Sequence, residues 1–200
     1  FSNSSGPYNT AAEQFNWKEK WHKIKSGNFT DVNYKWFEGG RLNITENCID
    51  RHLEVRGDKT AILFEPNNPD EETQYITYNQ LYRKVNKFAN VLKQEGVKKG
   101  DRVCIYLPMI PELAISVLAC ARIGAIHSVV FAGFSANALA TRINDSKCSM
   151  IITADGSFRG AKTIDLKGIV DKALKKCYSI KKVIVAKRIM SEINMKNGRD

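Results

Sequence analysis

The sequence predicts an α/β fold with a largely parallel sheet, and the stretch 100–155 carries this prediction. Short runs rich in β-branched and other apolar residues at 102–107, 125–131 and 149–153 alternate with segments of helical length. The helix expected over 112–123 is apolar on nearly every face, which is typical of a helix buried against a sheet. Strands and helices that alternate in this way form βαβ units.

Helix ends in this stretch are marked by residues with a physical preference for them. Pro111 suits the first turn of a helix, where its missing N–H costs nothing, and Gly124 suits the left-handed position after a helix end. Ser135 can cap the next helix through its hydroxyl. Thr77 and Gln80 have the spacing of a capping box, which predicts the start of an earlier helix that runs to residue 94.

The remaining expected elements extend the same alternation. Residues 60–65 and 73–77 should form two paired strands around a loop rich in proline and asparagine. Residues 166–177 should form a helix, and 182–186 a further strand. We expect the lysine-rich segment beyond this strand to be solvated.

The N-terminal part is less regular. Residues 1–10 should be a disordered tail, and 11–24 has helical spacing with an aromatic stripe, which favours a helix clamped to the body over a ligand site. Asn47 could cap a short helix. The run 50–52 (Asp-Arg-His) suggests either a catalytic group or a buried ion pair, and we favour the ion pair because no nucleophile lies within local reach.

Composition narrows the function. The chain has 200 residues, 43% of them hydrophobic, and its net charge of +10 favours phosphate-bearing ligands. Neither an apolar secretory leader nor a run long enough to span a membrane is present in the sequence. Its five cysteines are odd in number and never spaced CxxC, so we expect reduced thiols and a cytoplasmic protein, with the nucleus as an additional location.

Familiar catalytic motifs are missing from the sequence. It has no P-loop, no GxGxxG, no HExxH and no paired Cys/His spacing, so no metal site and no catalytic residue is expected. His127 lies within an apolar run, where we expect a buried core histidine rather than a base.

Two segments could receive a phosphorylated ligand. One follows the strand expected at 125–131, at the edge where open α/β sheets bind ligands, and it precedes a helix N-terminus. The other follows the strand at 149–153 and pairs a guanidinium with an ammonium across two small residues. A plain turn and a basic surface loop are the alternatives. The candidate residues are Phe131, Ala132 and Gly133 in the first segment, and Arg159, Gly160, Ala161 and Lys162 in the second.

Longer stretches identify a family resemblance. WFEGGRLNITENCIDRHL, ITYNQL, LACARIGAIHSVVFAGFS and ITADGSFRGAKTIDLK, in this order and spacing, resemble the AMP-forming acetyl-coenzyme A synthetases of the adenylate-forming superfamily. The resemblance runs from about residue 15 to residue 188. It is specific to the short-chain acyl branch of that superfamily.

The resemblance implies a two-step ligase. Acetate and ATP give acetyl-adenylate and pyrophosphate, and coenzyme A then displaces AMP. It also implies a layered N-terminal domain that is incomplete here, with an N-terminal segment over 11–68 and the first part of the AMP-binding domain over 69–200. The ATP and Mg²⁺ sites, the acyl pocket and the catalytic lysine would lie beyond residue 200, so the chain alone should be inactive.

By the same resemblance, the two candidate segments belong to the coenzyme A site. The turn matching Phe131, Ala132 and Gly133 would lie beside its nucleotide, and the stretch from Arg159 to Lys162 would bind its adenine and phosphates. The family usually has Arg-Gly-Gly-Lys or Arg-Ala-Gly-Arg there. In this chain Ala161 replaces a common glycine, while both cations remain.

Other functions stay open at this point. A propionyl-coenzyme A or other short-chain acyl-coenzyme A synthetase would share these motifs, and the chain could also be a non-enzymatic nucleotide- or coenzyme-binding module. Charge alone suggests nucleic acid, but the cations are scattered rather than gathered with exposed aromatics. We therefore expect small-molecule partners, no nucleic acid and no membrane. The sequence predicts no oligomeric state.

Overall fold

The computed structural model describes residues 7–200. The chain forms two compact units that divide between Val55 and Arg56. Residues 1–6 of the expected tail lie outside the described residues, and residues 7–10 begin helix α1 (Pro7–Glu13). The domain division expected after residue 68 stays a prediction.

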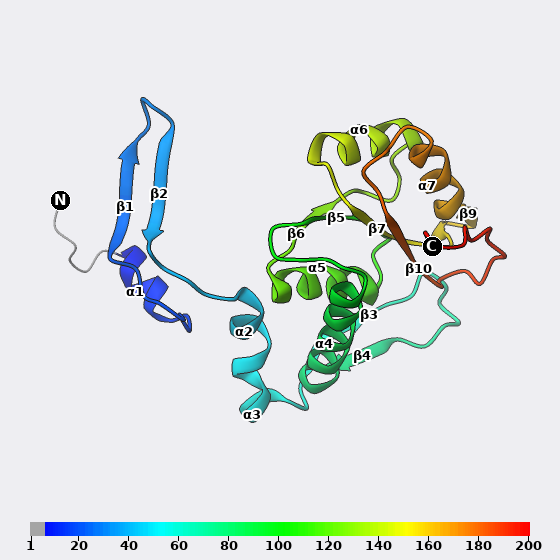
Figure 1. Cartoon of the computed structure of the whole chain (residues 1–200). Helices are drawn as coiled ribbons and strands as arrows, with labels where there is room; N and C mark the ends of the chain where they lie inside the picture. Colours follow the sequence, from blue (N-terminus) through cyan, green and yellow to red (C-terminus); the bar gives the residue numbers. More distant parts are fainter. Residues whose placement is uncertain (1–6) are drawn as a thin grey trace. The chain divides into compact units, whose positions relative to one another are not determined.

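The N-terminal unit consists of helix α1, an antiparallel hairpin and short helical turns (blue to cyan in Figure 1). Two reversals of the chain, at 29–32 and at 39–40, border the second strand of the hairpin. The elements are β1 (Lys23–Asn28), β2 (Asn33–Glu38), α2 (Ile44–Cys48), a 3-10 turn (Asp50–His52) and the start of α3 (Leu53–Arg56).

The helix expected over 11–24 is wrong. Helix α1 ends at Glu13, and residues from 23 onwards form strand β1. The aromatic side chains of this stretch instead build a ring cluster with β2: the ring centroids of Trp17 and Trp21 lie 5.6 and 5.2 Å from that of Phe37. These rings therefore pack against a strand that is distant in the sequence, instead of forming a stripe along one helix. Contacts between rings do not require residues at helical spacing.

The expectations for 43–53 are also corrected. Asn43, not Asn47, caps helix α2, and its side chain accepts from the N–H of Thr45. Asn47 is buried and exchanges two hydrogen bonds with the backbone of Asn16, at 2.7 and 3.0 Å. Arg51 is exposed and donates to the backbone carbonyl of Gln14, so Arg51 is not the cation of a buried ion pair.

The second unit is an α/β domain around a four-stranded parallel sheet with the order β10-β7-β5-β6, which confirms the predicted fold class. Helices α4 and α5 cover one face and α6 and α7 the other (Figure 1). Two antiparallel hairpins, β3–β4 and β8–β9, complete it. The elements are β3 (Thr60–Phe64), β4 (Gln74–Thr77), α4 (Tyr78–Gln94), β5 (Arg102–Tyr106), α5 (Pro111–Ile123), β6 (Ile126–Val129), α6 (Ala136–Ser146), β7 (Met150–Ala154), β8 (Ser157–Arg159), β9 (Lys162–Ile164), α7 (Leu166–Leu174) and β10 (Lys182–Ala186).

Four residue signals for helix ends in this unit are confirmed, whereas the helix expected over 166–177 ends earlier, at Leu174. Thr77 and Gln80 form a reciprocal capping box at the start of α4. Pro111 is the first residue of α5, and Gly124 follows it with φ of 73°, a left-handed conformation that costs glycine no Cβ clash. The hydroxyl of Ser135 accepts from a backbone N–H in the first turn of α6. Each of these signals acts within four residues, so the sequence alone could predict it.

The core lies between the central strands and the helices. All five residues of β7 are buried, whereas the outer strand β6 exposes Ile126 and Val129 by 54% and 51%. His127 on the same strand is exposed, so the buried core histidine predicted from the apolar run is wrong. An outer strand has a neighbour on one side only, and apolar composition does not reveal this position.

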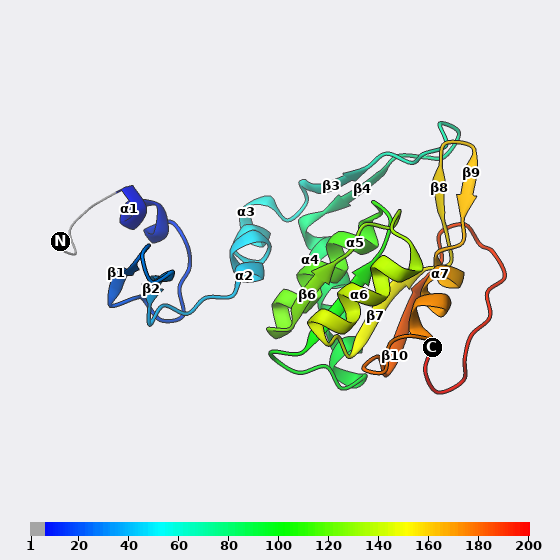
Figure 2. The same ribbon diagram turned by 90° about the horizontal axis from the view of Figure 1, so that it is seen from above.

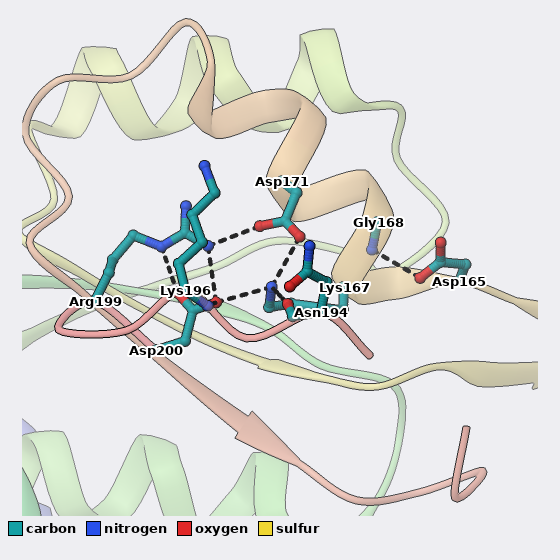
Figure 3. Close-up of polar contacts among 8 residues, drawn as sticks. All are labelled: Asp165, Lys167, Gly168, Asp171, Asn194, Lys196, Arg199 and Asp200. Atoms are coloured by element: carbon teal, nitrogen blue, oxygen red, sulfur yellow. Dashed lines mark hydrogen bonds and ion pairs between the residues drawn. The ribbon is translucent and has the colours of Figure 1, made fainter. Parts of the chain in front are cut away.

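The segment after β10 is anchored rather than fully solvated, as Figure 3 shows. The buried ammonium of Lys167 in α7 lies 2.8 Å from Asp171, 2.9 Å from Asp200 and 2.8 Å from the carbonyl oxygen of Asn194. Arg199 pairs with both carboxylates. Two cations thus share two carboxylates, which compensates the cost of burying the charge of Lys167.

Candidate functional site

A cleft of about 380 Å³ lies at the carboxyl edge of the parallel sheet. Its walls come from the segments that follow the four strands: 108–110 after β5, 131–133 after β6, 157–159 after β7 and Arg188 after β10. Open α/β sheets bind ligands at this edge. The structure thereby brings together the two segments that the sequence singled out separately. Phe64, Glu65, Asn67 and Ile164 complete the lining.

Tyr106, the last residue of β5, supports the backbone of the wall formed by 131–133. Its buried hydroxyl lies 2.7 Å from the carbonyl oxygen of Phe134 and 3.2 Å from that of Ala132. Burial, followed by the nearby Cys104, raises the pKa of Tyr106 to about 12, so the hydroxyl stays protonated and can donate. The exposed ring of Phe131 lies against Gly133, where a Cβ would meet the ring.

The wall that carries Arg159 is a hairpin, not the simple basic loop that the sequence suggested. Strands β8 and β9 are antiparallel, and Gly160 and Ala161 form the two-residue turn between them, with Gly160 at φ of 59°. Arg159 and Lys162 are directly paired across the hairpin and both are exposed. Side chains at directly opposed positions lie on the same face. Two like charges therefore stand side by side, an arrangement that a bound anion would stabilise.

Of this hairpin, Arg159 lines the cleft, whereas Gly160, Ala161 and Lys162 lie outside its lining, at or next to the turn. The Nδ2 of Asn67 lies 3.4 Å from the carbonyl oxygen of Gly160. This contact joins the hairpin to the loop between β3 and β4, and Figure 2 shows the two segments side by side.

Asp155 holds together two backbone segments beside the cleft, the one that follows β7 and the one that follows β10. One of its carboxylate oxygens accepts from the N–H groups of Gly156, Arg188 and Ile189, at 2.8, 2.7 and 3.1 Å. Burial alone would raise the pKa of Asp155, but these backbone hydrogen bonds, with one from Ser191, lower it overall. The carboxylate is thus ionised at neutral pH, and it ties the end of β7 to the end of β10.

Arg188 lines the cleft, although the sequence predicts no role for it. It lies in a lysine-rich segment for which the sequence predicts solvation, yet its side chain is only 17% exposed and lines the cleft. A signal was available. Arg188 follows the carboxyl end of a parallel strand by two residues, the same positional rule that selected the other two segments.

No cysteine or histidine of the described residues lines this cleft. Within residues 7–200, no group of three or more His, Cys, Asp or Glu side chains could hold a metal ion. All five cysteines are free thiols, of which Cys48 is exposed and the other four are buried. Burial raises the pKa of the Cys120 thiol to about 12, which suits a structural rather than a reactive group. No helix in the described part of the chain is long and apolar enough to cross a membrane.

Comparison with known proteins identifies the family. The family model described as AMP-binding enzyme matches residues 49–197, most of the chain. The chain belongs to this family. Residues 3–48 match a second model, described as the acetyl-coenzyme A synthetase N-terminus. The family resemblance inferred from the sequence motifs is therefore confirmed.

Individual members of the AMP-binding enzyme family resemble the chain over nearly its whole length. A protein named acetyl-coenzyme A synthetase from Desulfatibacillum aliphaticivorans is 57% identical over 94% of this chain and 29% of its own length. The protein of the same name from Bdellovibrio bacteriovorus is 52% identical over 94% of this chain and 30% of its own. The structure of acetoacetyl-CoA synthetase from Streptomyces lividans superposes with a TM-score of 0.85 at 25% identity and covers 95% of this chain and 28% of that one. The chain thus spans about 29% of the length of the first of these curated relatives.

Proposed function

We propose that the chain is the N-terminal part of an acetyl-coenzyme A synthetase and that its cleft receives the adenosine and phosphate end of coenzyme A. One observation carries the proposal: a single cleft at the carboxyl edge of the sheet is lined by both Phe131–Gly133 and Arg159. The relatives from Desulfatibacillum aliphaticivorans and Bdellovibrio bacteriovorus, both named acetyl-coenzyme A synthetase, support this substrate.

The residues suit the two halves of that ligand. The guanidinium of Arg159, with the ammonium of Lys162 paired beside it, offers charge-assisted hydrogen bonds to phosphate oxygens. The exposed ring of Phe131 and the apolar side chains of Met109 and Ile164 offer surface against which a base can pack. Gly133 has no Cβ, which leaves room for the ring of Phe131 against the backbone of this turn.

The remainder of the reaction belongs to the proposed complete enzyme. ATP, Mg²⁺ and acetate would be bound by residues outside this chain, so residues 1–200 alone should not form the acyl-adenylate. The chain's own contribution is to hold the nucleotide end of coenzyme A while its thiol displaces AMP from acetyl-adenylate. We infer a cytoplasmic location, with the nucleus in addition, from the five cysteine thiols and from the family resemblance.

The test uses the full-length protein and residues 1–200 in parallel. The full-length protein should catalyse acetate-dependent exchange of pyrophosphate into ATP and form acetyl-coenzyme A, and the shorter chain should do neither. Propionate and longer acids in the same assays determine which acid is preferred. Coenzyme A binding without any exchange by the full-length protein would refute the ligase and favour a binding module.

A further inference from the structure

Arg188 is the cation of the cleft to which the proposed binding mode gives no role. It follows β10, and its backbone N–H donates to the buried carboxylate of Asp155 at 2.7 Å. The backbone from which its side chain extends is therefore fixed to Asp155, directly after β7. Its side chain is largely enclosed, with 17% of its surface exposed.

The guanidinium of Arg188 contacts three segments at once. Its Nη1 lies 3.1 Å from the Oε2 of Glu71 in the loop between β3 and β4. Its Cζ lies 5.1 Å from the ring centroid of Phe158 in β8 and 5.7 Å from that of Phe64 in β3. A planar guanidinium can pair with a carboxylate through its edge while its faces contact aromatic rings. An ammonium is a compact point charge without this plane, so it cannot lie flat against a ring while its edge pairs with a carboxylate.

The hairpin that carries Arg159 depends on such outside support. Strands β8 and β9 have three residues each, and a short two-stranded hairpin is marginally stable by itself. Phe158, the ring that Arg188 contacts, is the residue directly before Arg159. A shift of Phe158 would therefore shift Arg159.

We propose that Arg188 is a positioning residue of the cleft: by holding Phe158 and Glu71 together, it orients Arg159 toward the ligand without binding the ligand itself. This inference rests on the proposed function, because Arg159 is the group through which Arg188 acts. The ligand class is the same phosphorylated nucleotide.

Glu71 separates positioning from direct binding. If Arg188 bound the ligand's phosphate, the carboxylate of Glu71 would compete with that phosphate, and Glu71→Gln would strengthen coenzyme A binding. If Arg188 positions the hairpin, Glu71→Gln removes part of its anchor and weakens binding. The two roles therefore predict changes of opposite sign.

The experiment measures the KM for coenzyme A in thioester formation and the rate of acetate-dependent pyrophosphate exchange, both with the full-length protein. Arg188→Lys should raise the KM about tenfold, and Glu71→Gln about two- to fivefold. Neither should change the exchange rate, which needs no coenzyme A. Glu72→Gln, an exposed neighbour of Glu71, and Arg83→Lys on α4 are matched controls and should change neither quantity.

A double variant tests whether Arg188 acts through Arg159. Arg159→Ala combined with Arg188→Lys should have the KM of Arg159→Ala alone, within about twofold, because coupled residues are not additive. Multiplied effects, a lower KM in Glu71→Gln, or equal losses in exchange and thioester formation would overturn the inference. If Arg159→Ala raises the KM and Arg188→Lys does not, the inference fails and the proposed site stands. If Arg159→Ala has no effect, both fail.

Discussion

Replacing Arg159 with alanine should weaken coenzyme A binding about ten- to hundredfold. Arg159 lines the cleft and is paired with Lys162 across the hairpin, so it can present a planar donor fork to a phosphate. A hydrogen bond to a charged group contributes about 1.5–3 kcal/mol, which corresponds to about ten- to hundredfold in affinity. The guanidinium is exposed, and water already solvates it, which favours the lower end of this range.

The assay follows the two half-reactions on the same full-length protein. Pyrophosphate exchange reports adenylation, which precedes the entry of coenzyme A and should be nearly unchanged in Arg159→Ala. Thioester formation at varied coenzyme A reports the site. Lys162→Ala should act in the same direction but less strongly, because an ammonium on a flexible stem loses more entropy for each contact and lies outside the lining of the cleft. Arg83→Ala, an exposed arginine on α4, is the matched control.

One result would refute the reasoning. If Arg159 only stabilises its own hairpin, its removal should lower the thermal stability and both half-reactions together. Equal losses in pyrophosphate exchange and thioester formation would therefore refute the assignment of Arg159 to the coenzyme A site. An unchanged KM for coenzyme A would have the same consequence.

Three further predictions concern stability. Tyr106→Phe should cost about 1 kcal/mol in denaturant unfolding, because the carbonyl of Phe134 loses its donor; an unchanged midpoint would contradict this. Gly124→Ala should cost about 1–2 kcal/mol, since the residue has φ of 73° and a Cβ would approach the side chain of Lys99; thermal unfolding measures it. Asp155 has a lowered pKa in the folded state, so its stabilisation is present above the ordinary aspartate pKa of about 3.9 and is lost progressively as the pH falls below that value and through the lower pKa of the folded state. The difference in melting temperature between the protein and Asp155→Asn should accordingly shrink below about pH 4, and a constant difference would argue against this role.

The sequence by itself determined those features that act over a few residues. Thr77 and Gln80, Pro111, Gly124 and Ser135 each mark a helix end through contacts within one turn, so the residue types and their spacing are enough to predict them. The alternation of strands and helices predicted the parallel sheet in the same way, since parallel strands need a covering helix between them. Motifs in fixed order identified the family.

Only the tertiary structure decided which side chains meet. The aromatic residues after α1 contact a hairpin instead of extending the helix, and His127 is exposed because β6 is an outer strand. Arg188 lines the cleft because β10 pairs with β7, although 29 residues separate it from Arg159 in the sequence. Strand order is set by packing across the whole sheet, whereas caps and turns are set by neighbours in the chain. The rule that ligands bind at the carboxyl ends of parallel strands can therefore predict each segment of the site. Only the assembled sheet shows that these segments line one cleft.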